Sequence, residues 1–324
     1  MSSRRRDGEF ELLEVFINSL ASLSNLAAAP FFLFTSSFHP RFPSPSSPAP
    51  LPSLTLSGAF IPFIMAGDPD LATTEKALRA LAAAGADAIE LGVPYSDPLA
   101  DGTTIQGAHT RGLDSKTTLD GVLACVARVS KDIPDTPIVM FTYYNPIMRK
   151  GAAAFCLAAA AAGASGLLVP DIPLEETPPI RAAAQAAGLE LVLLVTPTTP
   201  AARMEAISRA SQGFVYLVSV AGVTGARTAN EGRLQDLISA AREAARKGGN
   251  ESSSASDSNG AVDKPVAVGF GVSGPEQARQ IMGWGADGVI VGSALVRALG
   301  EAKSAEEGLK SMEKLAREIR AAIP

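Results

Sequence analysis

From Ala59 onward, short runs typical of β-strands alternate with alanine-rich segments that have helical periodicity. The strand-like runs lie at Phe60–Met65, Ala88–Leu91, Ile138–Thr142, Gly166–Val169, Leu191–Val195, Phe214–Val218, Val266–Gly269 and Gly288–Val291. Helices are expected at Leu71–Ala84, Thr117–Ser130, Ala152–Ala162, Glu175–Ala187, Ala201–Ala210, Leu234–Lys247, Pro275–Gly283, from Ser293 onward and at Ala305–Ala322. Eight strand–helix units over about 265 residues predict an α/β protein with a closed (β/α)8 TIM barrel, and a doubly wound open sheet is the main alternative.

Residues 1–57 differ in composition from the rest of the chain. An interrupted apolar stretch, Val15 to Phe34, contains too many polar residues to predict a membrane span, and a Ser/Pro-rich tract follows it at 36–57. Such a tract cannot bury enough apolar surface to become ordered. We therefore expect a disordered leader or transit peptide over 1–57, or a non-native start, followed by a single barrel domain over 58–324.

A second low-complexity segment, residues 248–264, is rich in serine, asparagine and glycine. It follows a predicted helix and precedes a predicted strand. This order places it on the N-terminal face of the barrel, whereas active sites in this fold lie on the C-terminal face. We expect the insertion to have no role in function.

Composition narrows the chemistry that the chain can support. The net charge is −5 and the folded part has no dense block of Lys and Arg, so nucleic acid is not an expected partner. Cys125 and Cys156 lie in helical patterns and are expected to be small core residues. Of the two histidines, His39 lies in the leader and only His109 in the barrel, so a histidine metal site or a Ser-His-Asp triad is not expected.

One ionisable residue, Glu90, interrupts the apolar run Ala88–Leu91, and the Gly/Pro-rich loop after it carries Asp97 and Asp101. A lone glutamate in such a run more often has a structural role, as a cap or in a pair with a nearby group. A carboxylate at the C-terminal end of a barrel strand, facing others in the next loop, instead indicates an acid–base group whose pKa is raised by burial.

Other residues at predicted strand ends fit the same site: Phe63 and Met65 on the first strand, Tyr143 after the third, Asp171 after the fourth and Tyr216 on the sixth. Each residue alone is a weak signal, because an aromatic side chain on a strand usually belongs to the core. Together they predict an apolar, partly aromatic cavity that holds carboxylates.

Three glycine-containing loops follow the last three predicted strands, at Gly222–Gly225, Gly269–Ser273 and Gly292–Ser293. Each could be a tight turn alone, but three in adjacent units indicate an anion site built from backbone N–H groups and a helix N-terminus. The expected substrate has a phosphate at one end and an apolar group at the other. No lysine ends a predicted strand, which argues against an imine-forming aldolase.

Four segments, Ala59–Pro69, Glu90–Gly102, Tyr143–Pro146 and Val218–Arg227, closely resemble the tryptophan synthase α subunit family, and the resemblance extends from about Ala59 to the C-terminus. The resemblance implies retro-aldol cleavage of indole-3-glycerol phosphate to indole and glyceraldehyde 3-phosphate in tryptophan biosynthesis. It implies a β-subunit partner in an α2β2 assembly, with pyridoxal phosphate in that partner and no cofactor or metal in this chain.

The resemblance also implies roles for individual residues. Glu90 would be the general acid–base, and Asp101 would accept a hydrogen bond from the indole N–H. The other implied substrate-binding residues are Phe63, Tyr143 and Tyr216 near the indole, Thr224 and Gly225 on a lid loop, and Gly225, Gly271, Gly292 and Ser293 at the phosphate.

The sequence departs from the family pattern at Met65, where threonine is common, at Phe141, where a smaller aliphatic is usual, and at Thr103, which replaces a typical proline. The amphipathic helix that usually precedes the first strand is not visible upstream of Ala59, and its loss would reduce stability. None of these departures removes a predicted catalytic group.

Two other functions remain open: a stand-alone lyase that releases free indole, and a catalytically weak module that activates a β subunit. A further phosphate-binding barrel enzyme, such as an epimerase, is disfavoured because metal ligands are missing. A plastid location is expected if the leader is genuine, and a cytoplasmic one otherwise.

Overall fold

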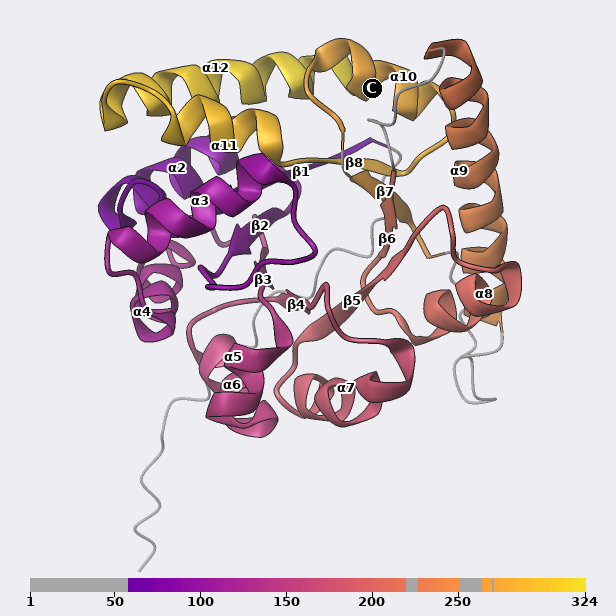
Figure 1. The fold of residues 1–324 in the computed structure, drawn as a ribbon, viewed down its shortest axis with the longest axis horizontal. Coiled ribbons are helices and arrows are strands. Elements are labelled where there is room, and N and C mark those ends of the chain that lie inside the picture. Colours follow the sequence, from indigo (N-terminus) through magenta and orange to yellow (C-terminus); the bar gives the residue numbers. More distant parts are fainter. Residues whose placement is uncertain (1–57, 220–226, 251–263, 270) are drawn as a thin grey trace, which may run out of the picture. The chain divides into compact units, whose positions relative to one another are not determined.

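The computed structural model describes residues 58–219, 227–250, 264–269 and 271–324. Eight parallel strands pair in chain order and close into a barrel, because β1 pairs with both β2 and β8 (Figure 1). The strands are β1 (Ala59–Met65), β2 (Ile89–Gly92), β3 (Ile138–Phe141), β4 (Gly166–Leu168), β5 (Glu190–Val195), β6 (Val215–Val218), β7 (Val266–Gly269) and β8 (Gly288–Val291). The predicted TIM barrel is therefore confirmed.

Helices surround the barrel (Figure 1). They are α2 (Leu71–Ala83), α3 (Thr103–Asp114), α4 (Leu119–Val129), α5 (Tyr144–Lys150), α6 (Ala152–Ala161), α7 (Thr177–Ala186) after a 3-10 turn at Leu174–Glu176, α8 (Ala201–Ala210), α9 (Arg227–Asn250), α10 (Pro275–Gly283), α11 (Ser293–Gly300) and α12 (Ala305–Ala322). The C-terminal pair α11 and α12 packs beside α2 and α3, so the last and first units of the barrel are neighbours.

Alternate residues of each strand face opposite sides of the barrel wall, as the period of a β-strand requires. On β2, Ile89 and Leu91 pack outward against the helices, in the larger core cluster. On β1, Phe63 and Met65 belong to a second cluster inside the barrel. Glu90, between Ile89 and Leu91, therefore faces the interior.

Helices α3 and α5 were not expected from the sequence. Two glycines, Gly107 and Gly112, lie within α3 and each weakens intrinsic helix formation by about 1 kcal/mol. Burial of Ile105, Ala108 and His109 on one face outweighs that cost. Helix α5 has only seven residues and contains Pro146, so its sequence carries little periodic signal.

The two low-complexity segments fall mainly outside the described residues. Helix α9 runs to Asn250, so residues 248–250 at the start of the predicted insertion belong to that helix. The rest of the insertion up to 263 and the whole leader, 1–57, lie outside the described part. Among the helices that are described, none combines the length and apolar character needed to cross a membrane.

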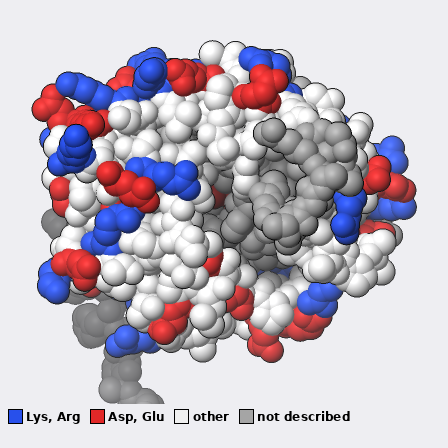
Figure 2. All heavy atoms as spheres, turned by 45° about the horizontal axis from the view of Figure 1, so that its top comes forward, with Lys and Arg blue, Asp and Glu red and all other residues white. Residues whose placement is uncertain are grey.

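On the face drawn in Figure 2, basic and acidic side chains are interspersed.

Candidate active site

Glu90 lies on β2 with its side chain in the barrel interior and only 1% of its surface exposed. Its Oε1 atom is buried and has no hydrogen-bond partner among the described residues. Burial raises the pKa of Glu90 to about 8, because a charged carboxylate is poorly solvated there. The carboxyl group can therefore either hold or release a proton near neutral pH.

A cavity opens beside Glu90 at the C-terminal end of the barrel. Its lining comes from several strand ends and the loops after them: Phe63, Glu90, Asp101, Ile105, Phe141, Tyr216, Gly271, Val272, Ile290, Gly292 and Ser293. The rings of Phe63 and Phe141 meet edge to face with centroids 5.3 Å apart. One side of the cavity is thus an aromatic wall of the kind that binds a flat apolar group.

Asp101 lies in the loop between β2 and α3 and is 8% exposed. Its Oδ2 atom accepts a hydrogen bond of 2.8 Å from the Tyr143 hydroxyl and lies 3.1 Å from Nε2 of His109. Burial and the neighbouring Asp101 raise the pKa of Tyr143, which keeps the phenol protonated and able to donate. The backbone carbonyl of Asp101 accepts a hydrogen bond from the Gln106 side chain on α3.

Tyr216 on β6 contributes a buried hydroxyl to the same cavity. Burial, together with the nearby carboxyl groups of Glu90 and Asp101, raises the pKa of Tyr216 well above its usual value. A side chain at Gly269 on β7 would overlap the Tyr216 ring, so glycine is needed there for the tyrosine to take this position.

Gly271, Gly292 and Ser293 also line the cavity. Gly271 has a φ of +90°, a conformation that favours glycine. Gly292 is the N-cap of α11 and provides no side-chain cap, so the first N–H groups of that helix are available for an anion. Neutral backbone dipoles can hold a phosphate group here.

The cavity thus contains seven of the predicted site residues: Glu90, Asp101, Phe63, Tyr216, Gly271, Gly292 and Ser293. Tyr143 contacts Asp101 rather than lining the cavity. Thr224 and Gly225 lie outside the described residues. Asp171 is exposed and accepts a hydrogen bond of 2.9 Å from the backbone N–H of Tyr144, at the start of α5.

Sequence reasoning missed the partners that Asp101 finds on α3. His109 is 1% exposed and follows Asp101 by eight residues. The helical spacing of Ile105, Ala108, His109 and Gly112 is the signal that would have placed the histidine on the buried face. Among the described residues, no group of three or more His, Cys, Asp or Glu could hold a metal ion.

The family model described as tryptophan synthase alpha chain matches residues 55–324. The chain belongs to this family. The resemblance predicted from the four sequence motifs is thereby confirmed.

Similar proteins cover nearly the same length of chain. The tryptophan synthase alpha chain of Picosynechococcus sp. is 54% identical over 265 residues, which cover 82% of this chain and 93% of the relative. That of Arabidopsis thaliana is 49% identical and covers 82% of this chain and 90% of the relative.

Solved structures show the same barrel. Tryptophan synthase subunit alpha from Legionella pneumophila has a TM-score of 0.71 at 33% identity, covering 82% of this chain and 92% of that one. A chain from the tryptophan synthase α2β2 complex of Pyrococcus furiosus has a TM-score of 0.70 at 36% identity, and the match covers 82% of this chain and 98% of that one.

Proposed function

We propose that the chain cleaves indole-3-glycerol phosphate to indole and glyceraldehyde 3-phosphate, and that Glu90 and Asp101 are its two catalytic carboxylates. Membership of the tryptophan synthase alpha chain family makes the chain a lyase of tryptophan biosynthesis. The observation that carries the residue assignment is the buried, raised-pKa carboxyl of Glu90, which lines one cavity with Asp101 and with the uncapped start of α11.

In this reaction, indole C3 gains a proton and the hydroxyl on the adjoining glycerol carbon loses one. The bond between these two carbons then breaks, its electron pair returns to the indole ring, and the hydroxyl carbon becomes the aldehyde. Glu90 takes the hydroxyl proton and assists protonation at C3. A pKa of about 8 suits it to both tasks near neutral pH.

Asp101 acts on the nitrogen side of the ring. Protonation at C3 places positive charge on the indole nitrogen, and a carboxylate that accepts the N–H hydrogen bond stabilises that charge in a water-poor cavity. Phe63, Phe141 and Tyr216 bind the ring, and Gly271, Gly292 and Ser293 bind the phosphate through backbone N–H groups and the Ser293 hydroxyl.

The α2β2 complex named for the Pyrococcus furiosus relative supports a β-subunit partner. We assign this chain to an α2β2 assembly in which pyridoxal phosphate belongs to the β subunit. Cleavage measured with and without a β subunit separates three cases. Turnover that rises strongly with β supports the synthase, equal turnover alone supports a stand-alone lyase, and no turnover in either supports a non-catalytic module.

We further assign residues 1–57 to a leader and 58–324 to the barrel domain, with plastid import as the purpose of the leader. Sequencing the N-terminus of the mature protein tests this assignment. A mature chain that retains the leader would overturn it.

The catalytic assignment is tested with Glu90→Gln, which keeps the shape of the side chain and removes its proton chemistry. We expect cleavage to fall to background while indole-3-glycerol phosphate still binds. Glu190→Gln is the matched control, because Glu190 on β5 also has a pKa raised by burial, to about 7, but does not line the cavity. Near-normal turnover by Glu90→Gln would exclude Glu90 as the acid–base group.

A further inference from the structure

The single histidine of the described part of the chain, His109, has no assigned role in the chemistry above. It is almost fully buried on α3, in contact with the loop after β2 that carries Asp101. Its Nδ1 accepts a hydrogen bond of 2.9 Å from the backbone N–H of Tyr95. Because a backbone amide can only donate, Nδ1 carries no proton, and the neutral ring carries its proton on Nε2.

Nε2–H of His109 is therefore a donor aimed at Asp101 Oδ2, 3.1 Å away. The Tyr143 hydroxyl donates to the same oxygen, and that hydroxyl accepts in turn from the backbone N–H of Ala100 at 3.0 Å. Each of the two donors is thus oriented by a backbone amide of the loop that precedes Asp101. The two donors fix the plane of the carboxylate and leave Oδ1 without a hydrogen bond from the described residues.

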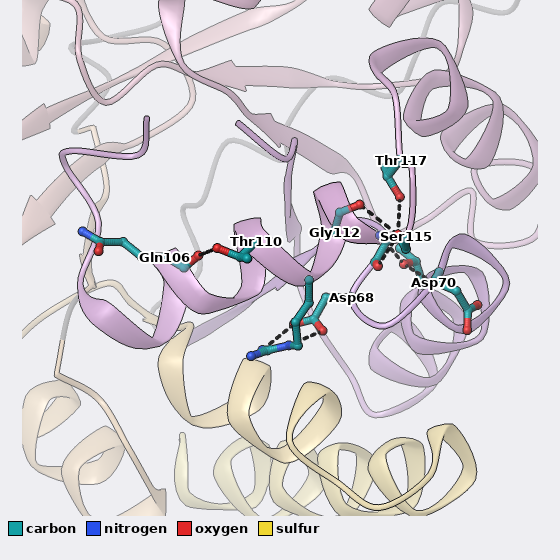
Figure 3. A network of polar contacts seen from close by, with 10 residues as sticks. Asp68, Asp70, Gln106, Thr110, Gly112, Ser115 and Thr117 are labelled. Atoms are coloured by element: carbon teal, nitrogen blue, oxygen red, sulfur yellow. Dashed lines mark hydrogen bonds and ion pairs between the residues drawn. The ribbon is translucent and has the colours of Figure 1, made fainter. Parts of the chain in front are cut away.

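Helix α3 holds His109 firmly, because its C-terminal half is anchored to the segment after β1 (Figure 3). Arg111 forms two hydrogen bonds, of 2.7 and 2.8 Å, with the buried carboxylate of Asp68. Ser115 donates to the Gly67 carbonyl at 2.9 Å. At the other end of the helix, Gln106 donates to the Asp101 carbonyl at 2.8 Å. The imidazole therefore has little freedom to move relative to Asp101.

We propose that His109 is a positioning residue for the cleavage reaction, which holds Asp101 through Oδ2 so that Oδ1 is presented to the indole N–H. The inference rests on the proposed function, since it presupposes that Asp101 meets the ring nitrogen. Charge on that nitrogen develops only as C3 is protonated. A misoriented Asp101 consequently lowers kcat more than it weakens substrate binding, which depends mainly on the phosphate end.

The test compares His109→Leu, which removes the donor, with His109→Gln, whose amide N–H reaches the position of Nε2. His109→Leu is expected to lower kcat about 10–100-fold with KM changed less than about threefold, and His109→Gln to recover most of the loss. Thermal unfolding of each variant, with activity expressed per folded protein, separates this effect from lost stability.

A second arm places both His109 substitutions in the Asp101→Asn background. If His109 acts through Asp101, His109→Leu changes the residual kcat by less than about twofold there, because the group it positions is already gone. A full additional loss in that background would overturn the inference, as would a normal kcat per folded His109→Leu protein. Failure of the wild-type chain to cleave indole-3-glycerol phosphate would instead overturn the proposed function.

Discussion

The hydroxyl of Tyr143 lies 2.8 Å from Oδ2 of Asp101 and joins the segment after β3 to the loop after β2. The Tyr143 ring also stacks on Tyr95, with centroids 5.0 Å apart and an angle of 25° between the planes. The carboxylate that we assign to the indole nitrogen is therefore held at a contact between two barrel units, the one that begins with β2 and the one that begins with β3. Its orientation depends on how these units pack, as well as on its own loop.

Replacing Tyr143 by phenylalanine should lower kcat/KM for indole-3-glycerol phosphate about 10–100-fold. The change removes one hydrogen bond to a buried carboxylate, worth about 1.5–3 kcal/mol, and retains the ring. Tyr95→Phe is the matched control: it keeps the stacked ring and loses only an exposed hydrogen bond of 3.2 Å from Asn145. Equal effects of the two substitutions in steady-state assays would exclude the hydroxyl contact as the cause.

Glu90 should make folding stability depend on pH in a way that Glu90→Gln removes. Folded Glu90, with a pKa of about 8, keeps its proton where the unfolded carboxyl, with a pKa of 4.5, has lost it. The folded state binds more protons within this window, so stability falls as pH rises from about 4.5 to about 8. Glutamine has no such proton to lose, so the melting temperature of Glu90→Gln should exceed that of the wild type by a margin that grows from pH 5 to pH 9.

The difference in melting temperature between the wild type and Glu90→Gln reports on Glu90 alone. Glu190, whose pKa burial raises to about 7, contributes a pH dependence of the same sign, but it does so in both proteins and cancels in the difference. Melting temperatures measured by circular dichroism across this pH range suffice. Parallel curves for the two proteins would mean that Glu90 is not held in its neutral form by the fold.

The strands could be predicted closely because each is a short apolar run between turn residues. Those at 266–269 and 288–291 have the predicted bounds, and the others differ by one residue at one or both ends. Helix α3 was not predicted in the same way, since its two glycines and several polar residues lower its helix propensity and its stability comes from tertiary packing.

The site residues also differ in whether a local sequence pattern or only tertiary packing reveals them. Glu90 is visible in the sequence because one ionisable residue interrupts an apolar strand, which is a local signal. The contact of His109 with Asp101 depends on helix α3, which was not expected from the sequence, and the contact of Tyr143 with Asp101 joins residues that are 42 apart. The second of these contacts is long-range, and such contacts leave no pattern in neighbouring residues.

The Asp68–Arg111 pair should contribute substantially to stability. Asp68 is 2% exposed, and Arg111→Met would leave its buried charge without a counter-ion, which should lower the free energy of unfolding by about 3 kcal/mol. The double variant Asp68→Asn/Arg111→Met should recover part of this loss, because the stranded charge is gone. Arg128→Met, which breaks an exposed pair with Glu75, should cost much less, and urea titration measures the free energy of unfolding of all these variants. A similar cost for both single variants would mean that burial of Asp68 is not decisive.

Gly92 should control the shape of the aromatic wall. A Cβ at this position would lie 2.8 Å from Cζ of Phe63 and 2.8 Å from Cε of Met65, so Gly92→Ala must displace both side chains. Movement of Phe63 into the cavity should raise KM for indole-3-glycerol phosphate about tenfold, because ring packing that contributes about 1 kcal/mol or more is lost. Adding Met65→Ala gives the new methyl group space on its other side and should restore KM. Gly283→Ala on α10, where a Cβ would meet nothing within 4 Å, controls for the substitution itself. An unchanged KM in Gly92→Ala would show that Phe63 does not bind the indole ring.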